Sequence, residues 1–380
     1  MMRVLCAPDS LKESLSAVEA AAAMVRGVQA AGGEAEACPI ADGGEGTVQA
    51  MVTATGGEFR TTRVMGPLGS PIDATWGVLG ALPGQPKTAV IEMAAASGLP
   101  LVPGEQRDPT RTTTYGTGEL VLAALEAGVQ RIVLGIGGSA TTDAGCGAAM
   151  ALGVRFFDAE GRPIDEPITG GMLDRIEHID LMARDRRLDK VELLIACDVT
   201  NPLTGPSGAA AVYGPQKGAS EQQVNELDAG LANVANCVEQ AGQADIRDMP
   251  GAGAAGGLGG GAVAMLGGEL RRGAELVLET VGFEQRVRGS DLCLTGEGKL
   301  DGQSLSGKAV MAVMAAAKRQ GIATVALVGA AEEVERAMAM GLAGCRVIGE
   351  GLPTSESIAH AGELMEKAAR EVVLERKPTA

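Results

Sequence analysis

The sequence predicts an α/β protein of two domains, one of them built from both ends of the chain. Strands and helices alternate without interruption over the last third of the chain: strand 292–295, helix 308–320, strand 324–328, helix 332–340, strand 346–348 and helix 355–373. Such alternation is typical of a parallel, doubly wound sheet with helices on both faces. The first strand, 3–7, and the apolar helical pattern after it resemble these last units. A length of 380 residues also exceeds one ordinary core.

The middle of the chain has a different pattern. Residues 59–64, 72–79 and 88–93 read as strands with no helix between them, which predicts a partly antiparallel sheet. Further expected elements are helix 118–127, strand 131–136, a helix after Asp143, strand 191–197 and helix 221–240. We therefore expect residues 1–65 plus 286–380 to form the α/β domain of the chain ends. Residues 66–285 would form an inserted mixed-sheet α/β domain, with an interdomain cleft.

Composition excludes several classes of partner. The net charge is −16 and the sequence pI is near 4.7, with no basic run, so nucleic acid and anionic membranes are poor partners. The seven cysteines are scattered and lack metal or disulfide spacing, which indicates free thiols in a reducing compartment. The N-terminus turns polar too early for a signal peptide, and no 18-residue apolar run is present. The cytoplasm is the expected location.

Five loops share one design, in which an apolar strand leads into small residues with one or two charges before a helix. They are residues 7–12, 41–46, 135–143, 197–202 and 295–301. Ligands of parallel sheets lie beyond the carboxyl ends of the strands, where free helix amides favour anions. Helix capping and turn formation explain any single loop better than ligand binding does. Capping does not explain all five, because it does not require Gly-Gly beside two acids.

Two glycine-rich motifs lack the neighbouring residues or elements that would confirm them. Residues 302–309 nearly match the P-loop, but Ala309 stands where a Ser or Thr should bind Mg²⁺, and Lys308 is as consistent with an exposed lysine as with a phosphate ligand. Residues 251–256 match G-x-G-x-x-G but follow a polar segment rather than a strand, so a Rossmann oxidoreductase is the weaker interpretation. We interpret residues 251–256 as a loop of small residues that lies close to the nucleotide.

The remaining chemistry belongs to carboxylates, lysines and backbone amides. Neither His178 nor His360 has metal-ligand or catalytic-triad spacing. Phosphoryl transfer needs positioning, charge neutralisation by groups such as Mg²⁺, and one base to accept a hydroxyl proton. The five loops offer residues of these types.

The loop sequences resemble those of the type-1 bacterial glycerate kinases. The matching segments are 8–16, 41–47 (ADGGEGT), 137–143, 197–203, 212–219 (VYGPQKGA), 251–259 and 295–308. The resemblance implies ATP-dependent phosphorylation of D-glycerate on its 2-hydroxyl, giving 2-phospho-D-glycerate, and a fold with one domain inserted in the other. Phosphorylation of the 3-hydroxyl, a nicotinamide-dependent hydroxy-acid oxidoreductase and a non-catalytic carboxylate sensor remain alternatives. Homo-oligomer formation is left open.

The sequence departs from this family at four loop positions. The family usually has Phe and Gly where this chain has Leu11 and Glu13, Asn in place of Thr142, and Gly in place of Ala144. The charged residues are intact. These departures bear on substrate positioning rather than on the reaction.

We assign roles to the loop residues as a hypothesis. The catalytic candidates are Asp198 as the base, Lys12 as the ligand of the glycerate carboxylate, and Lys308 as a phosphate ligand. The other substrate-binding candidates are Asp9, Ser10, Ser139, Asp143 and Asn201. The ATP-binding candidates are Lys217, Gly253, Gly256, Gly296 and Gln303. Asp42 and Glu45 would hold Mg²⁺, directly or through water, because that ion prefers oxygen ligands.

Overall fold

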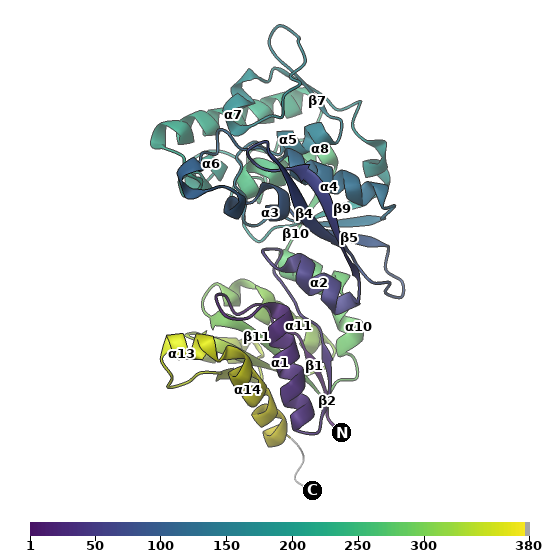
Figure 1. The fold of residues 1–380 in the computed structure, drawn as a ribbon, viewed down its shortest axis with the longest axis vertical. Coiled ribbons are helices and arrows are strands. Elements are labelled where there is room, and N and C mark those ends of the chain that lie inside the picture. The colour runs from purple at the N-terminus through teal and green to yellow at the C-terminus, as the bar shows by residue number, and fades with distance from the viewer. Residues whose placement is uncertain (377–380) are drawn as a thin grey trace.

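The protein contains two main sheets, one above the other along its long axis (Figure 1), in a computed structural model that describes residues 1–376. The lower sheet is entirely parallel, in the order β13-β12-β11-β1-β2. Its strands are β1 (Arg3–Cys6), β2 (Glu34–Ala37), β11 (Leu292–Leu300), β12 (Thr324–Ala331) and β13 (Gly344–Val347). Both chain ends therefore build one parallel sheet, as predicted.

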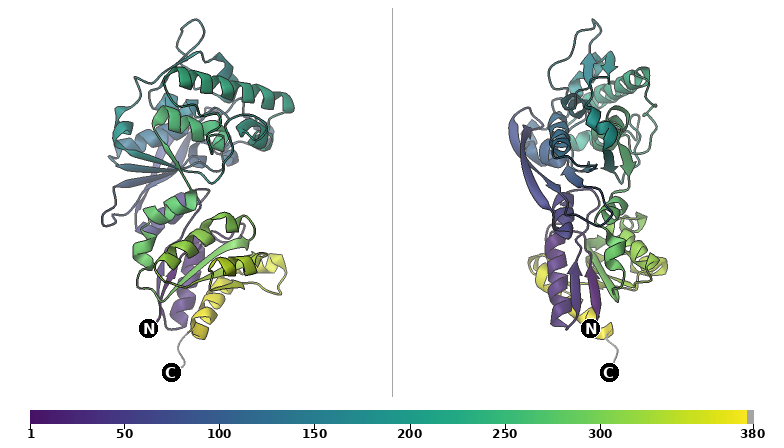
Figure 2. Two further views of the ribbon diagram at one scale, coloured as in Figure 1. Left: turned by 180° about the vertical axis from the view of Figure 1, so that it is seen from behind. Right: turned by 90° about the vertical axis from the view of Figure 1, so that its right-hand side faces the viewer.

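Helices cover both faces of this sheet (Figure 2). On one face α1 (Ala17–Ala30) and α14 (Ala361–Arg376) pack against apolar side chains of β1, β11 and β12. On the other face lie α11 (Ala309–Arg319) and α12 (Val334–Met340). The predicted helix 355–373 is interrupted at His360, so α13 (Thr354–Ala359) is separate from α14.

The upper sheet is mixed, in the order β10-β9-β6-β5-β4-β3. Its strands are β3 (Glu58–Met65), β4 (Pro71–Val78), β5 (Thr88–Glu92), β6 (Arg131–Gly135), β9 (Glu192–Ala196) and β10 (Glu269–Arg271). The β3–β4 and β4–β5 pairs are antiparallel and the others are parallel, which confirms the predicted mixed sheet.

The upper domain carries further helices and a two-stranded sheet. The helices are α3 (Ala94–Ser97), α4 (Tyr115–Glu126), α5 (Cys146–Ala151), α6 (Ala209–Tyr213), α7 (Glu221–Gln240) and α8 (Leu258–Leu266). The small sheet pairs β7 (Arg155–Phe157) with β8 (His178–Asp180). Short 3₁₀ turns include η1 (Leu99–Leu101), η2 (Gly104–Gln106), η3 (Gly170–Arg175), η4 (Arg186–Lys190), η5 (Pro215–Lys217), η6 (Ala254–Gly257) and η7 (Ser304–Ser306).

Three helices lie between the two sheets: α2 (Thr47–Thr55), α9 (Gly273–Thr280) and α10 (Phe283–Val287). Their apolar side chains share one buried cluster with Leu5 of the lower sheet and Val133 of the upper sheet. The two domains are therefore joined by a continuous apolar layer as well as by two chain crossings.

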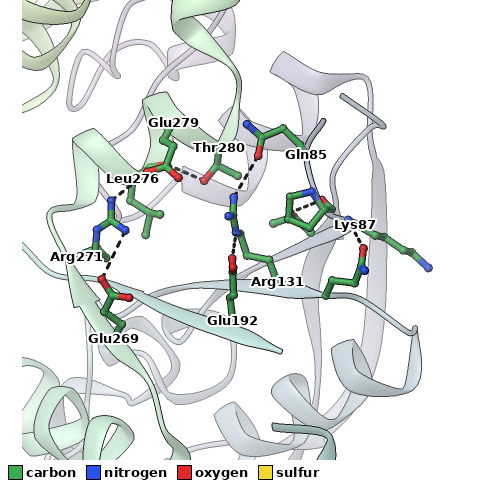
Figure 3. Close-up of polar contacts among 12 residues, drawn as sticks. Gln85, Lys87, Arg131, Glu192, Glu269, Arg271, Leu276, Glu279 and Thr280 are labelled. Atoms are coloured by element: carbon green, nitrogen blue, oxygen red, sulfur yellow. Dashed lines mark hydrogen bonds and ion pairs between the residues drawn. The ribbon is translucent and has the colours of Figure 1, made fainter. Parts of the chain in front are cut away.

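Ion pairs reinforce this layer along the upper sheet (Figure 3). Arg271, the last residue of β10, donates to the Glu279 carboxylate of α9 at 3.0 Å. Arg131 donates to Glu192 at 2.7 Å, which joins the first residues of β6 and β9. The first contact ties α9 to the strand that precedes it.

The predicted domain limits need adjustment at both crossings. β3 pairs along its whole length with β4, so residues 58–65 belong to the upper sheet rather than to the segment 1–65. The second predicted limit, at residue 286, falls inside α10. We propose that the chain enters the inserted domain near residue 57 and leaves it after β10, near residue 272.

Two strands differ from their predictions for local reasons. β11 continues to Leu300, beyond the predicted end at residue 295, because β12 pairs with it as far as the Leu300–Ala331 position. Glu297 therefore lies in a strand rather than in a loop. β2, of sequence EAEA, was not predicted, because this largely exposed strand has no apolar pattern. Within residues 1–376, no helix combines the length and apolarity needed to cross a membrane.

Candidate active site

The parallel strands of both sheets direct their carboxyl ends toward the junction between the domains. Three cavities lie there, of about 670, 590 and 1050 Å³, and we call them the first, second and third cavity. Asp42, in the connection between β2 and α2, lines all three. The three cavities of the junction therefore meet at the ADGGEGT loop.

The first cavity lies between the two sheets. Loops after β6 and β9 line it from above, and Gln303, Gly307 and Lys308 line it from the lower domain. Among the predicted site residues it contains Asp42, Ser139, Asp198, Lys217, Gln303 and Lys308. It also contains Tyr213, Gln216 and Arg272, which the sequence analysis did not select.

The second cavity lies at the carboxyl edge of the lower sheet. Among the predicted residues it contains Asp9, Ser10, Lys12, Asp42, Gln303 and Lys308. Part of its wall is apolar and comes from Ile348, Leu352 and Ile358. Lys308, which donates to the Gln303 side chain at 3.2 Å, lines both the first and the second cavity.

The third cavity opens beside the second and shares residues 9–14 with it. Glu45 lines only this cavity and is exposed. It shares this cavity with Asp42 but lines neither the first nor the second cavity, so its assignment to Mg²⁺ stays a prediction.

Acidic side chains around Asp42 perturb one another. Burial raises the pKa of Asp9 to about 7, and the nearby Asp42 charge adds to this effect. Burial likewise raises the pKa of Glu297 to about 7, and Oε1 of that residue is buried with no hydrogen-bond partner in the described part of the chain. Burial and Asp42 also raise the pKa of Asp198. A cation near Asp42 would relieve this mutual repulsion.

Asp198 is held by the start of α9. Its Oδ1 accepts a hydrogen bond of 2.9 Å from the backbone N–H of Gly273. A Cβ at Gly273 would lie 1.8 Å from the backbone oxygen of Asp42. The absence of a side chain at Gly273 therefore lets Asp42, from one domain, approach Asp198, from the other.

Lys217 is the most deeply buried cation of the site. The residue is 2% exposed, yet it is one of the residues that line the first cavity. Nζ donates to the backbone oxygen of Thr141 at 2.6 Å. Burial lowers the pKa of Lys217 to about 7, and the charge of Asp143 partly opposes the shift.

Asp143 lies away from all three cavities. Its carboxylate is fully buried and accepts hydrogen bonds from Thr114 N (2.8 Å), Thr114 Oγ1 (2.7 Å), Gly145 N (3.1 Å) and Gly147 N (3.3 Å). The geometry thus supports a structural role that holds the segment after β6, and we no longer assign Asp143 to substrate.

Three glycines assigned to ATP are packed against backbone instead. A Cβ at Gly256 would lie 2.0 Å from the backbone oxygen of Thr141, and one at Gly253 would lie 2.1 Å from that of Pro202. Gly296 is similarly packed against its neighbouring strand, and none of the three lines a described cavity. Ala254 and Ala255 line the first cavity in their place.

Asn201 contacts the site indirectly. Its Nδ2 donates to the backbone oxygen of Ser207 at 2.8 Å, and its Oδ1 accepts a 2.7 Å hydrogen bond from Tyr213 Oη. Tyr213 rather than Asn201 lines the first cavity. The geometry therefore gives Asn201 the role of positioning Tyr213.

Two of the residues that the sequence analysis did not select differ in their sequence signals. Glu297 stands in the predicted loop 295–301, and the glycine-and-acid composition of that loop is its only sequence signal. Arg272 follows β10, a strand of three residues that is too short for a pattern to reveal.

Two departures from the family pattern occur at unusual backbone angles. Glu13 has φ of 68° and Ala144 has φ of 54°, both in the left-handed region that favours glycine. The glycine that the family usually carries at these positions suits this conformation. This chain keeps the conformation with side chains that disfavour it.

Comparisons with known proteins agree with this architecture. A model of the glycerate kinase family matches residues 4–376. The chain is 46% identical to the glycerate kinase of Bacillus subtilis (strain 168) over 375 residues, covering 98% of this chain and 97% of that relative. It is 48% identical to the glycerate 2-kinase of Escherichia coli (strain K12) over 320 residues, covering 84% and 82%.

A solved structure matches nearly the whole fold. It is the crystal structure of a Salmonella typhimurium LT2 protein assigned as glycerate kinase 2, with a TM-score of 0.88 and 42% identity. The match covers 99% of this chain and 98% of that one. By sequence and by fold, the chain belongs to the glycerate kinase family.

Proposed function

We propose that this glycerate kinase transfers the γ-phosphoryl group of ATP to the 2-hydroxyl of D-glycerate. The convergence of Asp42, Asp198 and Glu297 with Lys308, where loops of both domains meet, carries the proposal. Phosphoryl transfer requires charge neutralisation and a base within one water-restricted junction. The name of the Escherichia coli relative, glycerate 2-kinase, supports the regiochemistry.

The acidic residues around Asp42 fit Mg²⁺. Asp42 and Glu297 would hold the ion, since Glu297 has a buried carboxylate oxygen without a described partner and its pKa is raised by burial. Within residues 1–376, no group of three or more His, Cys, Asp or Glu side chains is arranged to hold a metal. Mg²⁺ commonly takes one or two carboxylates and completes its shell with phosphate and water. The bound ion would neutralise triphosphate charge.

The two smaller cavities suit different parts of the substrates. The second cavity has an apolar wall for a base and would take the adenosine. Lys308 lies where it meets the first cavity, so it would contact the phosphates. Glycerate would then occupy the first cavity, next to Asp198.

Asp198 is our candidate for the base. Its Oδ1 is held by the Gly273 N–H, which orients the carboxylate and leaves Oδ2 to accept the proton of the 2-hydroxyl. Burial raises the pKa of Asp198, and this brings the carboxylate closer in basicity to the proton it must accept. An Asp198→Asn variant keeps the shape but lacks the basic oxygen, so kcat should fall by more than about tenfold.

A coupled assay tests both the reaction and its regiochemistry. ATP, Mg²⁺ and D-glycerate are supplied with enolase, either with or without phosphoglycerate mutase. Phosphoenolpyruvate formed without the mutase identifies the 2-phosphate. Formation only with the mutase would identify the 3-phosphate, and absence of ADP would refute the kinase proposal. A change in nicotinamide absorbance without ATP would favour an oxidoreductase.

We also propose that the enzyme acts in the cytoplasm. All seven cysteines are free, and Cys6, Cys38 and Cys293 are buried thiols. Free thiols are typical of proteins in reducing compartments. Fractionation of the native organism tests this location.

A further inference from the structure

We propose that Lys217 binds the carboxylate of the acceptor acid in the first cavity and so determines that the enzyme accepts an acid. The inference rests on the proposed function and deepens it. It replaces Lys12, our sequence-based candidate for the same role.

The charges of the three cavities differ in sign. The first contains the cations Lys217, Arg272 and Lys308 and the acids Asp42 and Asp198. The second contains Lys12, Lys299 and Lys308 against Asp9, Glu13, Asp42, Glu297 and Asp301. The third contains Lys12 against Asp9, Glu13, Asp42, Glu45 and Glu92. Only the first of these cavities has an excess of cations, so it suits a small anion that brings no metal.

Lys217 lacks a counter-ion inside the described protein. Its ammonium group has three N–H donors, and the described chain supplies one acceptor, the neutral carbonyl of Thr141 at 2.6 Å. In the part of the chain that the structure describes, Lys217 forms no ion pair with a carboxylate. The charge of Asp143 acts on Lys217, but the Asp143 carboxylate already accepts four hydrogen bonds from other groups.

A buried ammonium without an ionic partner is costly for the fold. Because Lys217 is 2% exposed yet lines the first cavity, a ligand there would meet an ammonium that water hardly screens. A carboxylate supplies the missing charge and accepts the remaining N–H groups in charge-assisted hydrogen bonds. Thr141, whose backbone oxygen accepts from Lys217, also has a buried hydroxyl without a partner in the described chain.

The other cations of the site are less suitable. Lys12 is exposed and lines only the second and third cavities, where acids predominate. Arg272 pairs with Glu275, at 3.7 Å. Lys308 lies where the first and second cavities meet, which is where we place the phosphates.

The test compares glycerate with its neutral amide. Isothermal titration calorimetry measures the dissociation constants of D-glycerate and D-glyceramide for the full-length protein, and the coupled assay measures kcat and KM. In Lys217→Met the Kd and KM for D-glycerate should rise about 10- to 100-fold, the range expected for a charged hydrogen bond. The affinity for D-glyceramide should change by less than about threefold, and so should kcat and the KM for ATP.

Two further variants isolate the charge. Lys217→Gln removes the charge but keeps an N–H donor, on a side chain one bond shorter than that of lysine, and it should reproduce the loss of glycerate affinity. Lys87→Met is the matched control, because Lys87 also donates its Nζ to a backbone oxygen, that of Ala127 at 2.6 Å, but lies outside the three cavities. It should leave every constant unchanged.

The outcomes separate the inference from the proposed function. If the parent enzyme forms no ADP from ATP and D-glycerate, the proposed function fails. If the parent is active but Lys217→Gln binds D-glycerate within about threefold of the parent, Lys217 is not the carboxylate ligand. A fall in kcat with unchanged Kd would also overturn the inference, since it would indicate a role in the reaction step. If Lys12→Met lowers the affinity for D-glycerate and the Lys217 variants do not, Lys12 is the carboxylate ligand.

Discussion

Gly273→Ala tests whether the close approach of the two domains organises the site. Gly273 donates its N–H to Asp198 Oδ1 at 2.9 Å. A Cβ at this position would lie 1.8 Å from the backbone oxygen of Asp42, whereas ordinary contact begins near 3.4 Å. One of the two segments must therefore move by about 1.6 Å, the difference between these distances. Neither neighbour can yield by a rotamer change, because the clash involves backbone.

The expected effects follow from this displacement. Forced overpacking costs about 1–3 kcal/mol, so the free energy of unfolding should fall by that amount. A misplacement of about 1 Å between reacting groups costs roughly 100-fold in rate, so kcat/KM should fall by about that factor. Alanine at this position adds only one methyl group and leaves the charges of the site unchanged.

The assay combines urea unfolding with the coupled ADP assay. Gly104→Ala is the matched control, since a Cβ there would meet no atom within 4 Å, and it should leave both quantities unchanged. If Gly273→Ala keeps kcat/KM within about threefold of the parent, the junction tolerates the displacement and our account of the site is wrong. A stability loss without a rate loss would likewise separate the packing of α9 from catalysis.

Four further changes test individual features of the structure. Asp143→Ala removes the acceptor of four buried hydrogen bonds, so unfolding free energy should fall by several kcal/mol in urea titrations; a change below about 1 kcal/mol would contradict the structural role. In the folded protein the pKa of Lys217 is about 7, below its ordinary value of 10.5. Between these two pH values the unfolded chain binds more protons than the folded one, so the free energy of unfolding of the parent should rise with pH, by at most about 1.4 kcal/mol per pH unit. Lys217→Met should lack this rise when unfolding midpoints at several pH values are compared, and parallel curves would refute the burial argument. Glu297→Gln should raise the Mg²⁺ concentration for half-maximal activity about tenfold. It should not lower the free energy of unfolding at pH 8, because burial makes the charged form of Glu297 unfavourable. An unchanged Mg²⁺ dependence would exclude Glu297 as a ligand. Glu13→Gly should raise unfolding free energy by up to about 1 kcal/mol, because φ of 68° favours glycine; a loss would show that the Glu13 side chain stabilises the loop.

Local patterns were sufficient for most helices and strands. α7 begins and ends at its predicted residues, and its N-terminus carries a capping box in which Ser220 Oγ accepts from Gln223 N at 3.3 Å. A similar box between Ser16 and Glu19 starts α1. The residues of each capping box lie within a few positions of one another, so the start of the helix can be predicted from the sequence without knowledge of the fold. β2 and the extension of β11 have no such signal, because pairing with neighbouring strands forms them.

The sequence by itself determined the kind of protein and the loops that matter. The order of strands and helices predicted a parallel sheet from both chain ends, and loop composition selected five glycine-and-acid loops, of which the one containing Asp42 lines all three cavities in the structure. Strand alternation and loop composition are local properties, which is why they could be predicted.

Only the tertiary structure decided which side chain of each loop reaches a cavity. Asp143 and Asp198 look alike as acids after a strand, yet one is enclosed by Thr114 and backbone amides while the other lines the junction. Lys217 belongs to a short turn with no catalytic pattern, and its burial makes it the charged group that most needs an anion. Burial and counter-ion distance depend on segments far apart in sequence, and no local pattern encodes them.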